Sequence, residues 1–235
     1  MQNIEEVWKE KFSAFAKAGG NDYQLSQWSE SGLKNYIKYF FEYFPEKNIR
    51  NSLALDVGCG PGTFSRLLVK RGFKVCAVDF SEEMVRAAKE RTEDKSIDYR
   101  TAEVCKLPFF DNYFDVVICS GVFQHVYDYK KALREMRRVL KNKGLLVITT
   151  LNSLSADSLF FKNELRRYNP YDMKKNMAVE NFSGVEIKGI YFSPFAPDFF
   201  TDFVLKSKIY RFFNFLFPVF CFFSHSFYIE GRKNI

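Results

Sequence analysis

The sequence predicts an α/β fold built on a doubly wound, mostly parallel sheet. From Ser52 onward, short runs rich in apolar and β-branched residues alternate strictly with stretches of helical periodicity. Such alternation is typical of right-handed β-α-β crossovers, with helices on both faces of the sheet. The segment LDVGCGPGT, residues 55–63, follows the first run. It lies at the strand end where sheets of this class bind ligands.

Two helices are predicted before the sheet. The first has an apolar face at helical spacing close to the N-terminus. The second spans residues 31–44, repeats aromatic side chains at the same spacing, and is ended by Pro45. The apolar face of the first helix consists of Ile4, Val7, Trp8, Phe12 and Phe15.

Strands and helices then alternate along the chain. Capping residues support the helix ends, with Ser81 before one helix and Gly72 and Gly144 after two others. Because the strands are parallel, their carboxyl ends share one edge of the sheet, and we expect the ligand there. The predicted strands span 53–57, 74–79, 97–101, 114–120 and 145–150, and the helices between them span 63–71, 82–91 and 128–140.

Composition limits the compartment and the chemistry. The chain has 235 residues, of which 47% are hydrophobic, enough for one sizeable core. Its N-terminus, MQNIEEVWKE, carries acids where a secretory signal would be basic and then apolar, which predicts a cytoplasmic protein. Five scattered cysteines without a CxxC pair, and only two histidines, predict no metal site.

The net charge of +7 favours anionic partners in general. The densest basic stretch, residues 130–143, keeps its apolar residues at helical spacing. A solvated helix face explains that stretch without a ligand. Charge alone therefore predicts no particular site.

Three glycines, Gly58, Gly60 and Gly62, leave bare backbone where the first strand meets a helix. Such backbone lets a ligand lie against the amide groups at the helix start. A simple turn needs one or two glycines, so three favour a nucleotide-like ligand. The dinucleotide fingerprint would require glycine where Thr63 stands. Asp79 ends the second strand, where an acid accepts hydrogen bonds from a ribose diol, so we expect a cofactor with free ribose hydroxyls.

Four segments in order resemble one family: LDVGCGPGT, VDFSEEM, AEVCKLPFFDNYFDVVICSGVFQHV and ALREMRRVLKNKGLLVITT. Together they are similar to the class I S-adenosylmethionine-dependent methyltransferases, and the subgroup they most resemble acts on small molecules, quinones, lipids and saccharides. The ending SHSFYIEGRK resembles the family's last strand. The resemblance implies a seven-stranded, Rossmann-like methyltransferase fold with N-terminal helices and a C-terminal helical insertion before the last strand. It also implies S-adenosyl-L-methionine as cofactor and S-adenosyl-L-homocysteine as product.

The family pattern assigns the ribose and adenine ends of the cofactor to three residues. Asp79 would accept hydrogen bonds from the ribose hydroxyls. Phe80 would pack on the adenine face. Glu103 stands where the family usually has an aspartate that reaches the adenine amino group.

At the methionine end, the resemblance implies contacts from Asp56 and from the loop of Gly58, Gly60 and Gly62. Ser120 and Gly121, at the end of the fourth strand, would border the methionine moiety and the sulfonium.

The resemblance also implies a single methyltransferase domain over residues 1–235. Within it, residues 1–50 would form a helical lid over the cofactor, and residues 51–151 the cofactor-binding core. Residues 152–235 would provide the acceptor-side helices and the final strands.

Methyl transfer from a sulfonium is an in-line displacement, which needs alignment and a dry pocket rather than a covalent nucleophile. An oxygen acceptor must also lose a proton, and His125 is placed to take it. The alternative is a structural histidine near a helix start. Gln124, Tyr127 and residues 166–168 are further candidates to face the acceptor.

The leading hypothesis is methyl transfer, at oxygen, to a small-molecule, saccharide or lipid-linked acceptor. One alternative is a non-catalytic module that binds S-adenosylmethionine, and another is a nucleic-acid methyltransferase, suggested by the basic charge. The fourth strand ends in CSGVF, which lacks the Asn/Asp-Pro-Pro-aromatic motif of exocyclic amine methylation and argues against nucleic acid. The sequence does not predict the oligomeric state.

The segment IYRFFNFLFPVFCFF, residues 209–223, is rich in phenylalanine. It is too short for a membrane span of about 20 apolar residues and is interrupted by Arg211, Asn214 and Pro218. Three interpretations stay open. The rings pack in the core, line an apolar acceptor pocket, or make peripheral contact with a membrane interface.

Overall fold

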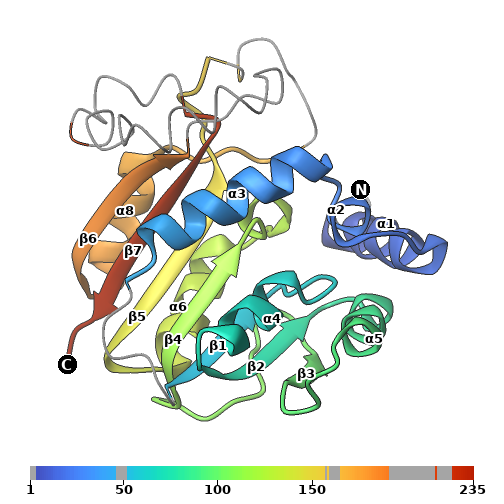
Figure 1. The fold of residues 1–235 in the computed structure, drawn as a ribbon. Helices are drawn as coiled ribbons and strands as arrows, with labels where there is room; N and C mark the ends of the chain where they lie inside the picture. The colour runs from blue at the N-terminus through green and yellow to red at the C-terminus, as the bar shows by residue number, and fades with distance from the viewer. Residues whose placement is uncertain (1–3, 46–51, 157, 159–164, 191–214, 216–223) are drawn as a thin grey trace.

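A computed structural model describes residues 4–45, 52–156, 158, 165–190, 215 and 224–235. It contains a seven-stranded sheet in the order β3-β2-β1-β4-β5-β7-β6 (Figure 1). β7 runs antiparallel to both of its neighbours, and the other neighbouring strands pair in parallel. This confirms the predicted doubly wound, mostly parallel sheet. The strands are β1 (Leu53–Val57), β2 (Lys74–Asp79), β3 (Asp98–Thr101), β4 (Phe114–Ser120), β5 (Leu140–Leu151), β6 (Phe182–Ile190) and β7 (Ser226–Lys233).

Helices fill the connections and precede the sheet. The bounds of β1, β2, β4 and α5 agree residue by residue with the sequence prediction. The helices are α1 (Ile4–Ala18), α2 (Asp22–Leu25), α3 (Glu30–Tyr43), α4 (Thr63–Lys70), α5 (Glu82–Arg91), the short 3-10 helix η1 (Phe123–His125), α6 (Tyr129–Val139) and α8 (Pro170–Val179).

The prediction was wrong at the start of β5. The helix before it ends at Val139, and β5 begins at Leu140 rather than near residue 145. Leu140 pairs with Phe114, and the register then shifts so that Leu145 pairs with Val116. The residues between them form an irregularity in the strand rather than a separate turn.

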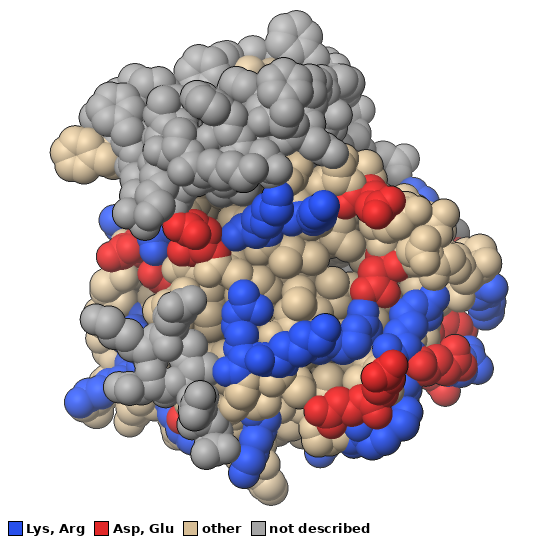
Figure 2. Space-filling view, in the orientation of Figure 1, with Lys and Arg blue, Asp and Glu red and all other residues tan. Residues whose placement is uncertain are grey.

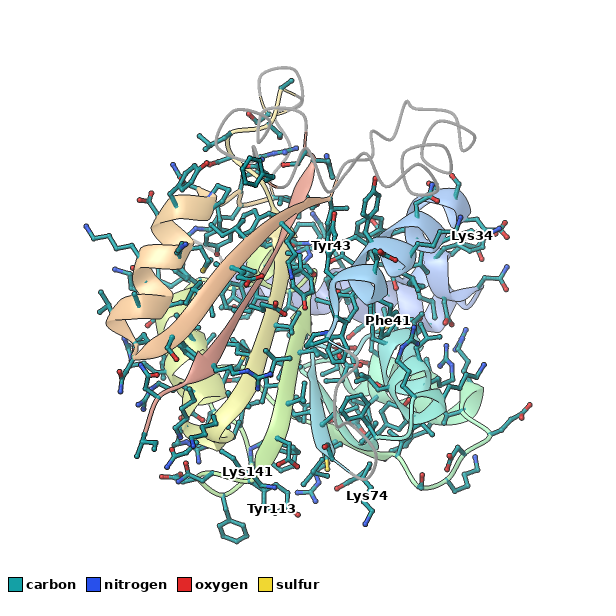
Figure 3. All side chains as sticks on the ribbon, turned by 60° about the vertical axis from the view of Figure 1, so that its left-hand side comes forward. Lys34, Phe41, Tyr43, Lys74, Tyr113 and Lys141 are labelled. Carbon is teal, nitrogen blue, oxygen red and sulfur yellow. The ribbon has the colours of Figure 1, made fainter. Side chains whose placement is uncertain are left out.

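Helix α3 crosses one face of the sheet (Figure 1). Its Phe40 packs against Phe64 of α4 and Tyr228 of β7, with ring centroids 4.8 and 5.8 Å apart. Tyr43 points from α3 to the sheet and donates a hydrogen bond to the Gly189 carbonyl at 2.8 Å (Figure 3). The apolar face of α3 is therefore buried, and one end of the helix is fixed to the last hairpin.

Helix α1 lies to one side of the sheet, above α5 (Figure 1). Phe12 and Phe15 pack in a small cluster with Leu25, Met84 and Ala87. The N-terminal segment thus has its own apolar contact with α5, apart from the main core.

Lys and Arg side chains spread over the face that carries α3 (Figure 2). Lys34 of α3 points outward from the body of the molecule (Figure 3). The guanidinium of Arg71 lies 3.5 Å from the centroid of the Phe41 ring. These cations lie on the outer surface, where water and salt screen them.

No helix within the described ranges is long and apolar enough to cross a membrane. Apart from Phe215, the phenylalanine-rich segment 209–223 lies outside the described residues. So does most of the region assigned to a helical insertion before the last strand. The three interpretations of that segment stay predictions.

Candidate cofactor and acceptor site

Two adjoining cavities lie at the carboxyl ends of β1, β2 and β4. One, the loop cavity, has a volume of about 130 Å³ and is bounded by the glycine loop and the N-terminal segment. The other, the β3 cavity, has a volume of about 240 Å³ and is bounded by the residues that follow β3. The two share the wall residues Gly58, Asp79, Phe80, Val122 and His125.

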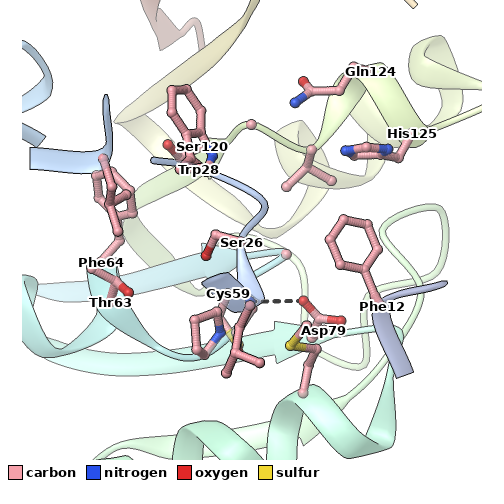
Figure 4. A pocket seen from close by; sticks show the side chains of 18 of the residues that line it. Phe12, Ser26, Trp28, Cys59, Thr63, Phe64, Asp79, Ser120, Gln124 and His125 are labelled. Atoms are coloured by element: carbon pink, nitrogen blue, oxygen red, sulfur yellow. Dashed lines mark hydrogen bonds between the residues drawn. The ribbon is translucent and has the colours of Figure 1, made fainter. Parts of the chain in front are cut away.

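Gly58 and Gly60 form the floor of the loop cavity, and both have positive φ angles, 70° and 50°. A Cβ atom on Gly58 would lie 2.2 Å from Cγ2 of Val122. The amide of Gly60 donates a hydrogen bond to Asp79 at 2.9 Å (Figure 4). The first two glycines therefore provide the bare backbone that the sequence predicts for a ligand.

Gly62 has another role. It has a φ of 82° and is the N-cap of α4, but it lines neither cavity. A Cβ atom there would lie 2.5 Å from the Tyr99 hydroxyl and 3.2 Å from Cβ of Ala88. Close packing of α4 explains this glycine, and its contact with the ligand stays a prediction.

Asp56 lies beneath the glycine loop. Its side chain is buried below the loop, accepts a hydrogen bond from the Ser65 hydroxyl at 2.6 Å, and lines neither cavity. Burial raises the pKa of Asp56 to about 7. The residue holds the start of α4 under the loop, and its contact with the methionine end of a ligand stays a prediction.

Asp79 lies at the junction of the two cavities. Its carboxylate accepts hydrogen bonds from the amides of Gly60 at 2.9 Å and Ser81 at 3.0 Å. Burial raises its pKa to about 6, although these amides favour the ionised form. Asp79 is thus a fixed acceptor that can receive further hydrogen bonds from a ligand.

Phe80 and Glu103, for which contacts with the adenine are predicted, both line the β3 cavity. The Phe80 ring lies edge-to-face against Phe12 of α1, with centroids 6.1 Å apart. Glu103 follows β3 and lines the cavity beside Ala102 and Val104. The β3 cavity therefore offers an aromatic ring, apolar walls and the carboxylates of Glu6, Asp79 and Glu103, with Lys9 also on its lining.

Ser120 and Gly121 line the loop cavity, and Ser120 belongs to a cluster that the sequence analysis missed. The Tyr36 hydroxyl is hydrogen-bonded to the Thr149 hydroxyl, and the Ser120 hydroxyl lies 3.1 Å from each. We call Tyr36, Ser120 and Thr149 the hydroxyl cluster. Burial raises the pKa of Tyr36 to about 12, so its hydroxyl is neutral at physiological pH.

His125 lines both cavities from η1. Trp8 and Phe12 of α1 pack on its ring at centroid distances of 4.4 and 5.1 Å. Among the described residues, its buried Nδ1 atom has no hydrogen-bond partner. Burial, helped by the charge of Lys11, lowers the pKa of His125 from the ordinary histidine value of 6.5 to about 4.

Figure 4 shows the loop cavity between two groups of aromatic side chains. Phe12 and His125 lie on one side, and Trp28 and Phe64 lie on the other. Of the further polar candidates, Gln124 reaches this cavity. Tyr127 is exposed, and the Tyr168 hydroxyl donates a hydrogen bond to the Phe123 carbonyl.

Comparison with known proteins assigns the site to a family. The family model of a methyltransferase domain matches residues 55–148. An uncharacterized protein of Methanocaldococcus jannaschii is 32% identical over 183 residues, covering 72% of this chain and 77% of that protein. The chain belongs to the class I S-adenosylmethionine-dependent methyltransferases. S-adenosyl-L-methionine is the cofactor of this methyltransferase.

Two further similarities extend beyond the core of the methyltransferase. A ubiquinone biosynthesis O-methyltransferase of Coxiella burnetii is 29% identical over 154 residues, covering 64% of each chain. A Haemonchus contortus phosphoethanolamine N-methyltransferase 2, solved with S-adenosyl-L-methionine, aligns with a TM-score of 0.70 at 18% identity. That alignment covers 100% of this chain and 61% of the nematode enzyme, and at this identity it shows the fold alone.

The residues present in the methyltransferase fit the cofactor. A Cβ atom at Gly58 would fill part of the cradle between the loop and Val122. Asp79 supplies an acceptor for ribose hydroxyls between the two cavities. The β3 cavity is large enough and sufficiently apolar to take a planar base.

Proposed function

We propose that this methyltransferase transfers the methyl group of S-adenosyl-L-methionine to a hydroxyl oxygen of a small-molecule or lipid-linked acceptor whose reacting end is uncharged. The observation that carries the proposal is the wall of the loop cavity. Its lining combines aromatic side chains with Tyr36 and Ser120 of the hydroxyl cluster, and none of the described residues that line it is Lys or Arg.

The cofactor would lie across both cavities. Asp79 would accept hydrogen bonds from the ribose hydroxyls, while Phe80 and Glu103 would bind the adenine in the β3 cavity. Gly58, Gly60, Ser120 and Gly121 would surround the methionine end. Asp56 and Gly62 would support this arrangement from beneath the loop.

The reaction needs little covalent help from the protein. The bond between sulfur and the methyl group breaks as the bond between the acceptor oxygen and the methyl group forms, and the acceptor proton must leave. His125 is the group proposed to receive that proton. A pKa of about 4 keeps its imidazole neutral, the form that can accept a proton, but makes it a weak base.

The hydroxyl cluster would hold the acceptor in line. Three hydroxyl groups can bond one another and still offer lone pairs to a ligand. Because the three mutual bonds use the three hydroxyl protons, the cluster would accept a hydrogen bond from the acceptor hydroxyl rather than donate one. A rigid contact of this kind aligns the oxygen with the methyl group.

The walls argue against a phosphate group at the reacting end. Phosphate sites commonly use Arg and Lys, which are absent from the described lining of the loop cavity, and the amides at the start of α4 would be occupied by the cofactor. On the face shown in Figure 2, Lys and Arg side chains lie on the outer surface. The similarity to a ubiquinone biosynthesis O-methyltransferase supports a hydroxylated ring as acceptor.

A panel of acceptors tests the proposal. We expect S-adenosyl-L-homocysteine to form from S-adenosyl-L-methionine in the presence of dihydroxybenzenes or hydroxylated quinol rings, with methyl ethers identified by mass spectrometry. Tyr36→Phe should lower kcat/KM about tenfold, as expected for a hydrogen bond of about 1.5 kcal/mol. Turnover confined to phosphoethanolamine or RNA would overturn the proposal. Cofactor binding without turnover of any hydroxyl compound would favour the non-catalytic module.

A further inference from the structure

The segment between α1 and α3 is tied to the glycine loop by one acidic side chain. Asp22 opens α2, a helix of four residues whose N-cap Asn21 forms a capping box with Gln24. The carboxylate of Asp22 bonds the guanidinium of Arg66 in α4 and accepts a hydrogen bond from the Thr63 hydroxyl at 2.6 Å. A single carboxylate thus holds the first turn of α4, directly behind the cofactor loop.

Arg66 extends this contact into the loop itself. Its Nη1 atom donates a hydrogen bond to the carbonyl of Pro61 at 2.7 Å. Pro61 lies between Gly60 and Gly62 and lines the loop cavity. The pair of Asp22 and Arg66 therefore connects the N-terminal segment to the backbone that bounds the cofactor site.

Arg91 adds a third point of attachment. Its Nε atom lies 3.7 Å from Asp22, and its Nη2 atom donates to the Gly20 carbonyl at 2.6 Å. Arg91 is the last residue of α5, so α4 and α5 hold the same short segment. We call Asp22, Arg66 and Arg91 the latch.

The segment directly after Asp22 forms part of the site wall. Its Leu25, Ser26 and Trp28 line the loop cavity. Holding Asp22 on α4 therefore positions three wall residues. It also fixes one end of the segment whose other end, α1, places Trp8 and Phe12 against His125.

We propose that the latch keeps the N-terminal segment closed on the glycine loop, so that the rate at which the bound cofactor leaves is set by the Asp22–Arg66 ion pair. The inference rests on the S-adenosylmethionine site, but not on the identity of the acceptor. Asp22 and Arg66 are positioning residues, because they act through Pro61 and the wall rather than by touching the ligand.

The test uses S-adenosyl-L-homocysteine. Because this molecule lacks the sulfonium charge, removal of a carboxylate does not change its affinity through direct attraction to a sulfonium. We expect Asp22→Asn to raise its dissociation constant about tenfold in calorimetry, mainly through faster release. The chain has two tryptophans, Trp8 and Trp28. Trp8 lies in α1 and Trp28 between α2 and α3, so both belong to the N-terminal segment. Their fluorescence in a stopped-flow displacement experiment therefore reports release directly.

Three comparisons separate the latch from general destabilisation. Asp98→Asn breaks an Asp–Arg pair within β3, that of Asp98 with Arg100, and should leave affinity unchanged. Asp22→Glu should restore most of the affinity. The double variant with Arg66→Gln should lose less affinity than the sum of the two single losses, because both substitutions remove the Asp22–Arg66 interaction.

Salt gives an independent readout. The side chains of Asp22 and Arg66 are about a quarter exposed, so added salt should weaken the pair. We expect the affinity of the wild type to fall between 50 mM and 500 mM KCl, and that of Asp22→Asn to stay constant. Equal release rates in Asp22→Asn and wild type would overturn the latch, whereas failure of the wild type to bind would instead overturn the cofactor site.

Discussion

At the scale of single residues, the two buried acids of the site have opposite surroundings. Asp79 faces the cavities and is held by amides, while Asp56 is enclosed and bonded by one hydroxyl. Burial raises the pKa of both carboxyl groups. Each group therefore binds a proton more tightly in the folded protein than in the unfolded chain.

Asp56 makes folding stability depend on pH. Its pKa rises from 3.8 to about 7 on folding, so its contribution is fully present below 3.8 and is lost as the pH rises to about 7. Each pH unit in that window costs about 1.4 kcal/mol of the free energy of unfolding per group. Asp56→Asn removes the dependence while keeping an acceptor for Ser65.

Urea unfolding of Asp56→Asn and wild type at pH 5 and pH 8 measures this effect. When the pH is raised from 5 to 8, the free energy of unfolding of the variant should increase by about 1 to 3 kcal/mol relative to that of wild type. Comparing the two proteins cancels the titration of Asp79 and His125. An equal difference in the free energy of unfolding between the two proteins at pH 5 and pH 8 would contradict the raised pKa of Asp56.

His125 is tested by two substitutions. If it receives the acceptor proton, His125→Ala should lower kcat about a hundredfold with little change in affinity for S-adenosyl-L-homocysteine. Because its pKa is lowered to about 4, the rate of the wild type should not fall until the pH drops well below 6.5. The acidic limb of a kcat/KM profile measures this.

His125→Phe is the matched control, since it keeps a ring against Trp8 and Phe12 but removes the nitrogens. If His125 is a base, this variant should be as slow as His125→Ala. Activity within threefold of wild type in His125→Phe would assign the residue to packing.

At the scale of elements, the glycines of the loop before α4 have different roles. Gly58→Ala places a methyl group against Val122 in the cofactor cradle, and Gly62→Ala places one against Tyr99 in the packing of α4. We expect the first to weaken cofactor binding more than tenfold and the second to lower mainly the melting temperature. Calorimetry and thermal unfolding separate the two effects.

Gly184→Ala supplies the control for backbone strain. Gly184 has a φ of 60° with open space around its Cβ position and lies in β6. We expect a loss of about 1 kcal/mol of stability and unchanged affinity. A Gly58→Ala protein that binds as tightly as Gly184→Ala would remove the loop from the cofactor site.

At the scale of the whole molecule, sequence patterns predicted the features that depend on residues close together in the chain. Apolar runs and caps gave the bounds of β1, β2, β4 and α5, and the loop motif predicted Gly58, Gly60 and Asp79 at one edge of the sheet. Strand β6 was missed because it is half-exposed and has no continuous apolar run. Helix α2 was missed because four residues carry no periodicity, although the spacing of Asn21 and Gln24 was a signal for it.

The parts of the site that depend on distant contacts could not be read in the same way. Tyr36 and Thr149 are 113 residues apart, and Asp22 and Arg66 are 44 residues apart. From the sequence, Tyr36 is one of many aromatic residues on the face of a helix. Its place in the site becomes visible when α3 lies across the sheet.

The position of β7 has a consequence for how the chain folds as it is synthesised. β7 is the last strand in the sequence, yet it lies between β5 and β6. While the ribosome is still making residues 191–225, β5 and β6 have no partner on their facing edges. Exposed strand edges of this kind attract other chains. In a nascent chain, or one cleaved before β7, one edge of β5 is therefore open and β6 has no strand partner among the described strands, so such a chain is prone to pair with other chains.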